Sequence, residues 1–83
     1  MAQEKILALD KEHKFLKKLP SKSGVYLFLT KKKEVLYVGR ATFLNKRVSS
    51  YFQKRLEPRL EEMVNKSFYL QFIPTDNLLE AII

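Results

Sequence analysis

Residues 24–40 of the chain read Gly24-Val25-Tyr26-Leu27-Phe28-Leu29-Thr30-Lys31-Lys32-Lys33-Glu34-Val35-Leu36-Tyr37-Val38-Gly39-Arg40. Two runs of Val, Leu, Tyr and Phe flank a charged segment, a pattern typical of two strands joined by a polar turn. Because side chains alternate along a strand, Tyr26 and Tyr37 share a face only if the loop has an even number of residues; an odd number separates them. We expect Gly24 and Gly39 side by side at the open end, where another backbone or a ligand can approach closely.

Length and composition favour one small domain. The chain has 83 residues, of which 46% are hydrophobic, and its lack of cysteine excludes a disulfide scaffold and thiolate metal sites. Its longest apolar run, Val25 to Leu29, is too short to span a membrane, so we expect a cytoplasmic protein without membrane association. The net charge of +7 predicts a surface that binds nucleic acid, although a lysine-rich surface can also serve solubility alone.

The rest of the chain reads as helices and one more strand. Apolar residues at helical spacing before Pro20 predict a helix over 3–18 that covers one face of the sheet. A second helix is predicted over 43–54, with Leu44, Val48 and Phe52 buried and with Arg47 and Tyr51 at the edge of this apolar face. That edge position is also what an arginine and a tyrosine reaching towards solvent would occupy without any function.

The C-terminal half completes an α+β fold. Pro58 suits the start of a helix over 58–65, and the alternating residues of 67–73 predict a strand. A last helix is predicted over 77–83. The expected architecture is therefore a small, mainly antiparallel sheet of three strands (24–30, 34–39 and 67–73) flanked by four helices.

Two triplets separated by ten residues carry a family resemblance. Gly24-Val25-Tyr26 and Tyr37-Val38-Gly39 resemble the signature of the GIY-YIG nucleases, with Val in place of Ile in both. Leu19-Pro20 before the first triplet, the block from Gly39 to Phe52 and the run Thr75–Ala81 are most similar to the UvrC branch of this superfamily. That branch makes the incision 3′ to a lesion in bacterial nucleotide excision repair.

The resemblance covers residues 15–83, so we expect residues 1–83 to be a single endonuclease domain and an N-terminal fragment of a longer chain. Ser23 departs from the branch, which usually has a proline before the first motif glycine. We therefore expect the start of the first strand of the hairpin to be looser here.

The resemblance implies catalytic roles for Tyr26, Tyr37, Arg47, Tyr51 and Glu80. The first tyrosine would orient or deprotonate the attacking water; a free tyrosine has a pKa of roughly 10, so this role needs nearby cations. Arg47 would bind the phosphate, and Tyr37 and Tyr51 would act as positioning groups. Glu80 would hold Mg²⁺ or Mn²⁺, because one carboxylate can suffice when phosphate completes the metal's shell. Further phosphate contacts are predicted for Arg40, Lys46 and Lys54.

Glu80 has a second interpretation. If Asn77 caps the last helix, Glu80 occupies the position whose carboxylate binds back to the cap, and the two roles compete for the same oxygens. The overall function also has alternatives: a GIY-YIG nuclease of a mobile element or a stand-alone repair enzyme, or a basic nucleic-acid-binding module without chemistry. The partners implied by the resemblance are DNA, UvrB and the UvrA–UvrB damage complex, the last two through regions absent from this chain.

Overall fold

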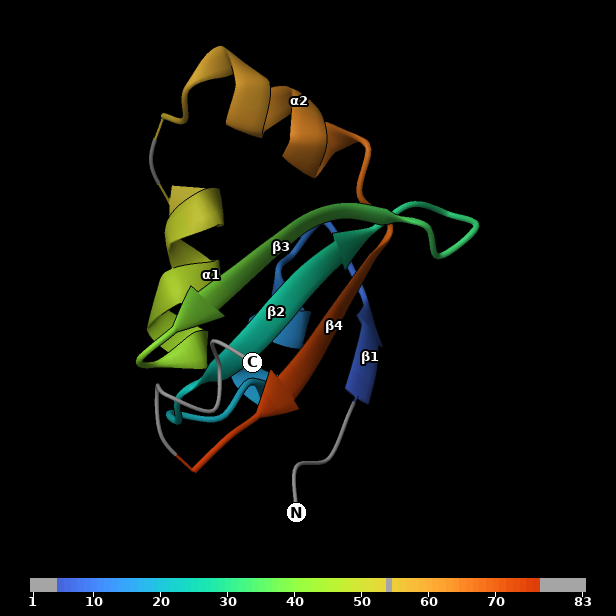
Figure 1. Cartoon of the computed structure of the whole chain (residues 1–83). Coiled ribbons are helices and arrows are strands. Elements are labelled where there is room, and N and C mark those ends of the chain that lie inside the picture. Colours follow the sequence, from blue (N-terminus) through green and yellow to red (C-terminus); the bar gives the residue numbers. More distant parts are fainter. Residues whose placement is uncertain (1–4, 54, 77–83) are drawn as a thin grey trace.

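A computed structural model describes residues 5–53 and 55–76. The elements in chain order are strand β1 (Lys5–Ala8), 3-10 helix η1 (Lys14–Lys18), β2 (Gly24–Leu29), β3 (Val35–Ala41), α1 (Leu44–Gln53), α2 (Pro58–Asn65) and β4 (Tyr69–Pro74). All neighbouring strands are antiparallel, and their order across the sheet is β1-β4-β2-β3 (Figure 1). The predicted α+β class, the hairpin and the helices over 43–54 and 58–65 are confirmed, with small shifts at the ends of elements.

The register of the hairpin settles which residues share a face. Tyr26 lies opposite Gly39, and Phe28 lies opposite Tyr37. Tyr26 and Tyr37 therefore point to the same side of the sheet. The loop 30–34 between β2 and β3 has five residues, an odd number, and the register shift between Phe28 and Leu29 compensates for it. The turn is closed at Thr30, whose N–H donates to the Glu34 carbonyl and whose carbonyl accepts the Lys33 N–H, each at 2.8 Å.

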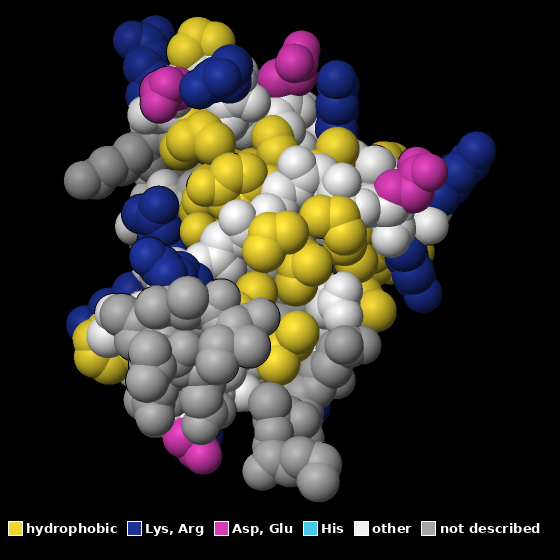
Figure 2. Space-filling model, in the orientation of Figure 1, with side chains coloured by type: hydrophobic (Ala, Val, Ile, Leu, Met, Phe, Trp, Pro, Cys, Tyr) yellow, Lys and Arg dark blue, Asp and Glu magenta, His cyan; other side chains and the backbone are white. Residues whose placement is uncertain are grey.

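The hydrophobic core lies between one face of the sheet and the two helical segments α1 and η1. It comprises Phe15, Leu19, Tyr26, Phe28, Ala41, Leu44, Val48, Tyr51, Leu70 and Phe72. Figure 2 shows further hydrophobic side chains gathered over the middle of the molecule on the face turned to the viewer. Neither α-helix of the described residues has the length and apolar character needed to cross a bilayer.

The predicted helix over 3–18 is wrong. Residues 5–8 form β1 instead, with Lys5 opposite Phe72 and Ala8 opposite Tyr69, and only Lys14–Lys18 is helical, as a short 3-10 helix. Within the part of the chain that the structure describes, the sheet consequently has four strands where three were expected. The physical reason is that β4 has backbone N–H and C=O groups on the side away from β2, and pairing with β1 satisfies them.

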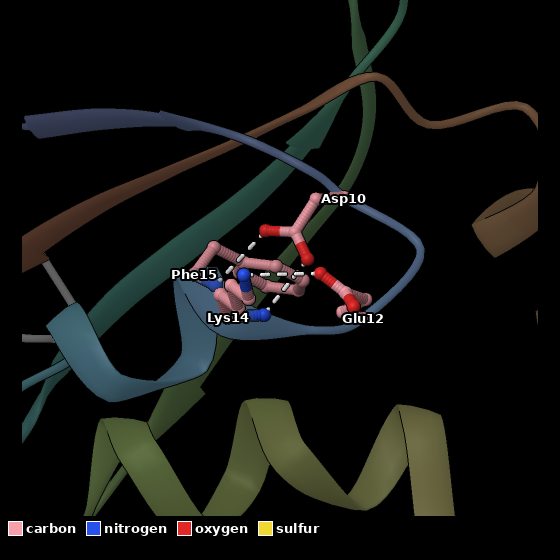
Figure 3. Close-up of polar contacts among 4 residues, drawn as sticks. All are labelled: Asp10, Glu12, Lys14 and Phe15. Carbon is pink, nitrogen blue, oxygen red and sulfur yellow. Dashed lines mark hydrogen bonds and ion pairs between the residues drawn. The ribbon is translucent and has the colours of Figure 1, made fainter.

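Asp10 lies between β1 and η1, and its side chain binds backbone N–H groups at the start of η1. One of its carboxylate oxygens accepts the Lys14 N–H at 2.8 Å and the other accepts the Phe15 N–H at 3.2 Å, while Lys14 Nζ lies 3.1 Å from Glu12 (Figure 3). The hydrogen bond from Lys14 is the main cause that lowers the pKa of Asp10. His13 has a φ of 59°, in the left-handed region, so a continuous helix through this segment is excluded.

Ser23 fastens the start of β2 to the residue after β4. Its carbonyl accepts the Thr75 N–H at 2.9 Å, and its hydroxyl donates to the Thr75 carbonyl at 3.2 Å. The expectation of a looser start is therefore wrong, because the serine side chain adds a cross-strand hydrogen bond that a proline could not make.

Candidate active site

Tyr26 lies at the centre of the site and depends on the glycine across from it. The tyrosine is 1% exposed and stands on β2 directly opposite Gly39 of β3. A Cβ on Gly39 would overlap the outer end of the Tyr26 ring, so only glycine leaves the space in which this ring lies. The second motif glycine thus positions the tyrosine of the first motif.

Gly24 has a different role from the one expected. It lies opposite Ala41, so the two glycines are not side by side. A Cβ on Gly24 would lie 2.5 Å from the Ile73 carbonyl oxygen and 2.8 Å from a methyl group of Leu44. The close approach that Gly24 permits is therefore that of the protein's own β4 backbone and α1 side chain.

Helix α1 brings two more functional candidates to Tyr26. Leu44, Val48 and Tyr51 recur at the spacing of one helix face, and all three are buried. Tyr51, at 4% exposed, belongs to the core, whereas Phe52 is only partly buried. The prediction that Phe52 is buried and Tyr51 lies at the edge of the apolar face is therefore wrong. Arg47 lies on the exposed side of this face, one turn before Tyr51.

The polar ends of these side chains converge on the Tyr26 hydroxyl. Its oxygen lies 2.8 Å from the Tyr51 hydroxyl oxygen, and it accepts a hydrogen bond from Arg47 Nε at 3.3 Å. The Arg47 guanidinium carbon lies 5.6 Å from the centre of the Tyr51 ring. The Tyr37 ring completes the group, with its centroid 6.4 Å from that of Tyr26 and 6.2 Å from that of Tyr51.

The electrostatics of the group distinguish the two bonded tyrosines. Burial, and then the hydrogen bond with Tyr26, raise the pKa of Tyr51, so this hydroxyl keeps its proton at neutral pH and can donate it to Tyr26. The guanidinium of Arg47 can only donate, and its hydrogen bond to Tyr26 raises the pKa of Arg47. The Arg47 guanidinium and the Tyr51 hydroxyl, which can act as a donor, thus both face the Tyr26 oxygen, where they can stabilise negative charge.

An open cleft of about 440 Å³ gives access to this group, and we call it the tyrosine cleft. It is lined by Val25, Tyr26, Tyr37, Val38, Gly39, Arg40 and Arg47. None of these described residues carries a carboxylate, and no group of three or more His, Cys, Asp or Glu within residues 5–53 and 55–76 could hold a metal ion. The described part of the cleft is therefore cationic and phenolic.

The remaining candidate residues are placed differently. Lys46 does not line the tyrosine cleft; its Nζ lies 5.1 Å from the centre of the Phe43 ring. Lys54 and Glu80 lie outside the described residues, so their roles stay predictions. Sequence reasoning missed Phe43, an exposed aromatic ring beside the cationic residues; its only signal was an aromatic position outside the apolar stripe of the helix.

The coupling between Gly39 and Tyr26 predicts a stability effect. We expect Gly39→Ala to lower the free energy of unfolding by about 1–3 kcal/mol, because the new methyl group overlaps a ring that is buried on its other sides. Urea denaturation measures this loss. In the Tyr26→Ala background the same substitution should cost much less, whereas an equal cost in both backgrounds would show that the ring is not the obstacle. Val38→Ala, on the exposed side of β3, is the control.

Comparison with known proteins agrees with this geometry. Residues 22–83 match the model of the UvrC-like GIY-YIG domain, and the chain belongs to this family. UvrABC system protein C of Methanococcus maripaludis is 42% identical over 78% of this chain, and that of Methanothermobacter thermautotrophicus is 44% identical over 80%. These alignments span only 12% and 11% of the two relatives.

A solved structure is also similar. The GIY-YIG N-terminal endonuclease domain of UvrC from Thermotoga maritima, bound to magnesium as its catalytic divalent cation, superposes with a TM-score of 0.71. The two chains are 27% identical, and the match covers 83% of this chain and 80% of that one.

Proposed function

We propose that this chain is the catalytic domain of a metal-dependent DNA endonuclease that makes the 3′ incision of nucleotide excision repair. The observation that carries the proposal is the Tyr26 hydroxyl, held by Tyr51 and Arg47 beside a cationic cleft. Membership in the UvrC-like GIY-YIG family supports the reaction type. The UvrABC relatives support the repair pathway, and the magnesium-bound Thermotoga maritima domain supports the cation.

Hydrolysis of a phosphodiester requires a deprotonated nucleophile and stabilisation of charge on the phosphoryl and leaving oxygens. Tyr26 would orient the attacking water and accept its proton, since the donors from Arg47 and Tyr51 stabilise the ionised oxygen that performs this step. Arg40 and the outer nitrogens of Arg47 would bind the phosphate oxygens. Tyr37 would fix the orientation of the Tyr26 ring.

A bound divalent cation, Mg²⁺ or Mn²⁺, supplies charge neutralisation at the phosphate and lowers the pKa of water. We propose Glu80 as its protein ligand, because Mg²⁺ needs only one or two carboxylates when substrate phosphate completes its shell. The described lining of the tyrosine cleft has phenols and guanidinium groups but no carboxylate, so these residues suit the phosphate and leave the metal to another segment. Glu80 follows β4, whose last residue pairs with Gly24, two positions before Tyr26.

DNA is the proposed substrate, and the net charge of +7 favours binding to its phosphates. UvrB and the UvrA–UvrB damage complex are the proposed partners, since the relatives are components of a UvrABC system. We place this activity in the cytoplasm, where such repair takes place. The chain has no cysteine, so its fold does not depend on disulfide bonds, which a reducing compartment would not maintain.

A domain exchange tests the proposal. The 83-residue chain replaces the corresponding domain of Thermotoga maritima UvrC, and the chimaera is assayed with UvrA and UvrB on a labelled duplex that contains one lesion. We expect 3′ incision with Mg²⁺ or Mn²⁺, its loss on addition of EDTA and its return with excess cation. Arg47→Ala should abolish the incision, whereas Arg59→Ala, which removes an exposed arginine on α2, should not.

Two results would overturn this assignment. Cleavage of undamaged DNA without UvrA and UvrB would indicate a GIY-YIG nuclease of another lineage. DNA binding without any metal-dependent cleavage, in an assay where the parent UvrC cleaves, would indicate a nucleic-acid-binding module without chemistry.

A further inference from the structure

Phe43 is an aromatic side chain that the proposed reaction does not use. It lies between β3 and α1 and is 46% exposed. Its carbonyl accepts the Arg47 N–H at 3.0 Å, so its backbone is fixed at the first turn of α1 while its ring stays outside the core. A single exposed apolar side chain is common on protein surfaces, so its neighbours decide whether it has a role.

The neighbours of Phe43 are cationic. The ring borders a second hollow of about 420 Å³, whose lining includes Arg40, Lys46, Arg47 and Ser50. Arg40 and Arg47 also line the tyrosine cleft, so the two hollows adjoin. Lys46 Nζ lies 5.1 Å from the centre of the Phe43 ring, within the range of a cation–π contact. Figure 2 shows Lys and Arg side chains at the edge of the molecule where α1 lies.

The backbone at the start of α1 does not offer an anion site here. The Leu44 N–H donates to the Lys22 carbonyl at 2.8 Å, and the Asn45 N–H donates to the Pro20 carbonyl at 3.2 Å. The Lys46 N–H is bonded to the Asn45 side chain at 2.9 Å. Recognition at this place therefore depends on side chains: a flat aromatic face with three cations around it.

We propose that Phe43 stacks against an unpaired base of the DNA strand whose phosphates bind Arg40 and Arg47. Stacking of a base on an aromatic ring, next to cations that follow the backbone, is the usual means of binding single strands without reading their sequence. A base inside a duplex is stacked on both faces, so only an unpaired base can lie on the ring. This inference rests on the proposed function and adds a preference for locally unwound DNA. Lys46 covers the ring in the free protein and contacts a phosphate in the complex.

Binding of the 83-residue chain to matched oligonucleotides tests the proposal. Fluorescence anisotropy compares a thymidine strand, a strand of equal length with abasic sites at its central positions, and a duplex. We expect Phe43→Ala to weaken binding of the thymidine strand about tenfold and to change the other two affinities less than about twofold. Phe68→Ala is the matched control: Phe68 is 51% exposed, but it precedes β4, and its N–H donates to Leu29 at the other end of β2.

A second variant reports on stacking directly. The chain contains no tryptophan, so Phe43→Trp introduces a single indole fluorophore at the proposed stacking position. We expect this variant to keep the affinity for the thymidine strand and its emission to be quenched by that strand far more than by the abasic one. Circular dichroism checks that each variant has the fold of the parent chain.

Three results would overturn the stacking site and leave the proposed function intact. They are an unchanged affinity of Phe43→Ala for the thymidine strand, an equal loss on the abasic strand, and an equal loss in Phe68→Ala. A parent chain that binds neither strand nor duplex at low salt would instead contradict DNA as the substrate, and with it both the proposed function and this inference.

Discussion

Replacing Tyr26 with phenylalanine should lower the rate of 3′ incision about a thousandfold while the fold is retained. The change removes one oxygen and leaves the ring in the space that Gly39 provides. Loss of a general base typically costs 10²- to 10⁴-fold in rate, roughly 3–5 kcal/mol of transition-state stabilisation. The buried Tyr51 hydroxyl loses a partner, so the free energy of unfolding should fall by about 1–3 kcal/mol. Single-turnover incision by the chimaera and urea denaturation measure the two effects.

Two other tyrosines provide controls for this substitution. Tyr51→Phe removes a donor to Tyr26 but not the base, because the raised pKa of Tyr51 keeps it protonated; a rate loss of about tenfold is expected. Tyr69→Phe removes a hydroxyl from β4, outside the tyrosine cleft, and should leave the rate unchanged. If Tyr26→Phe incises within a few fold of the parent rate, the proton acceptor is another group.

Replacing Glu80 with glutamine should stop incision with little change in stability. Glutamine keeps the side-chain length and an oxygen that can accept a capping hydrogen bond, but it lacks the charge that holds a divalent cation. Loss of the ligand and of the cation should lower the rate about a thousandfold or more, and added Mg²⁺ or Mn²⁺ should rescue it poorly. Single-turnover incision by the chimaera, thermal unfolding and titration with Mn²⁺ measure rate, stability and metal affinity separately.

The capping interpretation of Glu80 makes the opposite prediction. In that case Glu80→Gln would retain the rate and the Mn²⁺ affinity, and the melting temperature would fall. Glu62→Gln provides the matched control, because the exposed Glu62 side chain on α2 forms an ion pair with Lys66 at 3.9 Å, away from the tyrosine cleft. This control should change neither incision nor Mn²⁺ affinity.

The hairpin and two helices were predictable because their signals are local. Alternation in 24–40, Pro58 and the spacing of Leu44 and Val48 each act within a few residues. The first segment was not predictable, because β1 exists through its pairing with a strand more than sixty residues later. Residues 3–18 do have apolar side chains at helical spacing. The Asp10 side chain, however, accepts the N–H groups of Lys14 and Phe15, and residues 5–8 pair with β4, so no continuous helix forms.

The sequence predicts which residues form the site better than it predicts how they are arranged. Helical spacing places Arg47 and Tyr51 one turn apart. Strand parity leaves open whether Tyr26 and Tyr37 share a face, because they do so here through a register shift near the turn that no local signal indicates. The sequence alone does not indicate that Tyr51 enters the core and shares a hydrogen bond with Tyr26, because this depends on how closely α1 approaches the sheet. The register of β2 and β3 places the Tyr26 ring over Gly39, and this too is not visible in the sequence alone.

The position of β4 constrains how the chain can fold during its synthesis. Among the strands of the described residues, β4 is translated last, yet it lies between β1 and β2, so β1 has no neighbour in the sheet until residues 69–74 emerge. Before that moment the nascent chain can form the hairpin and α1. The core is still incomplete, because it lacks Leu70 and Phe72 of β4. Non-local pairing of this kind delays folding, because long segments must be ordered before their contacts form. Tyr26 therefore gains Phe72, its neighbour on β4, only after these residues have emerged.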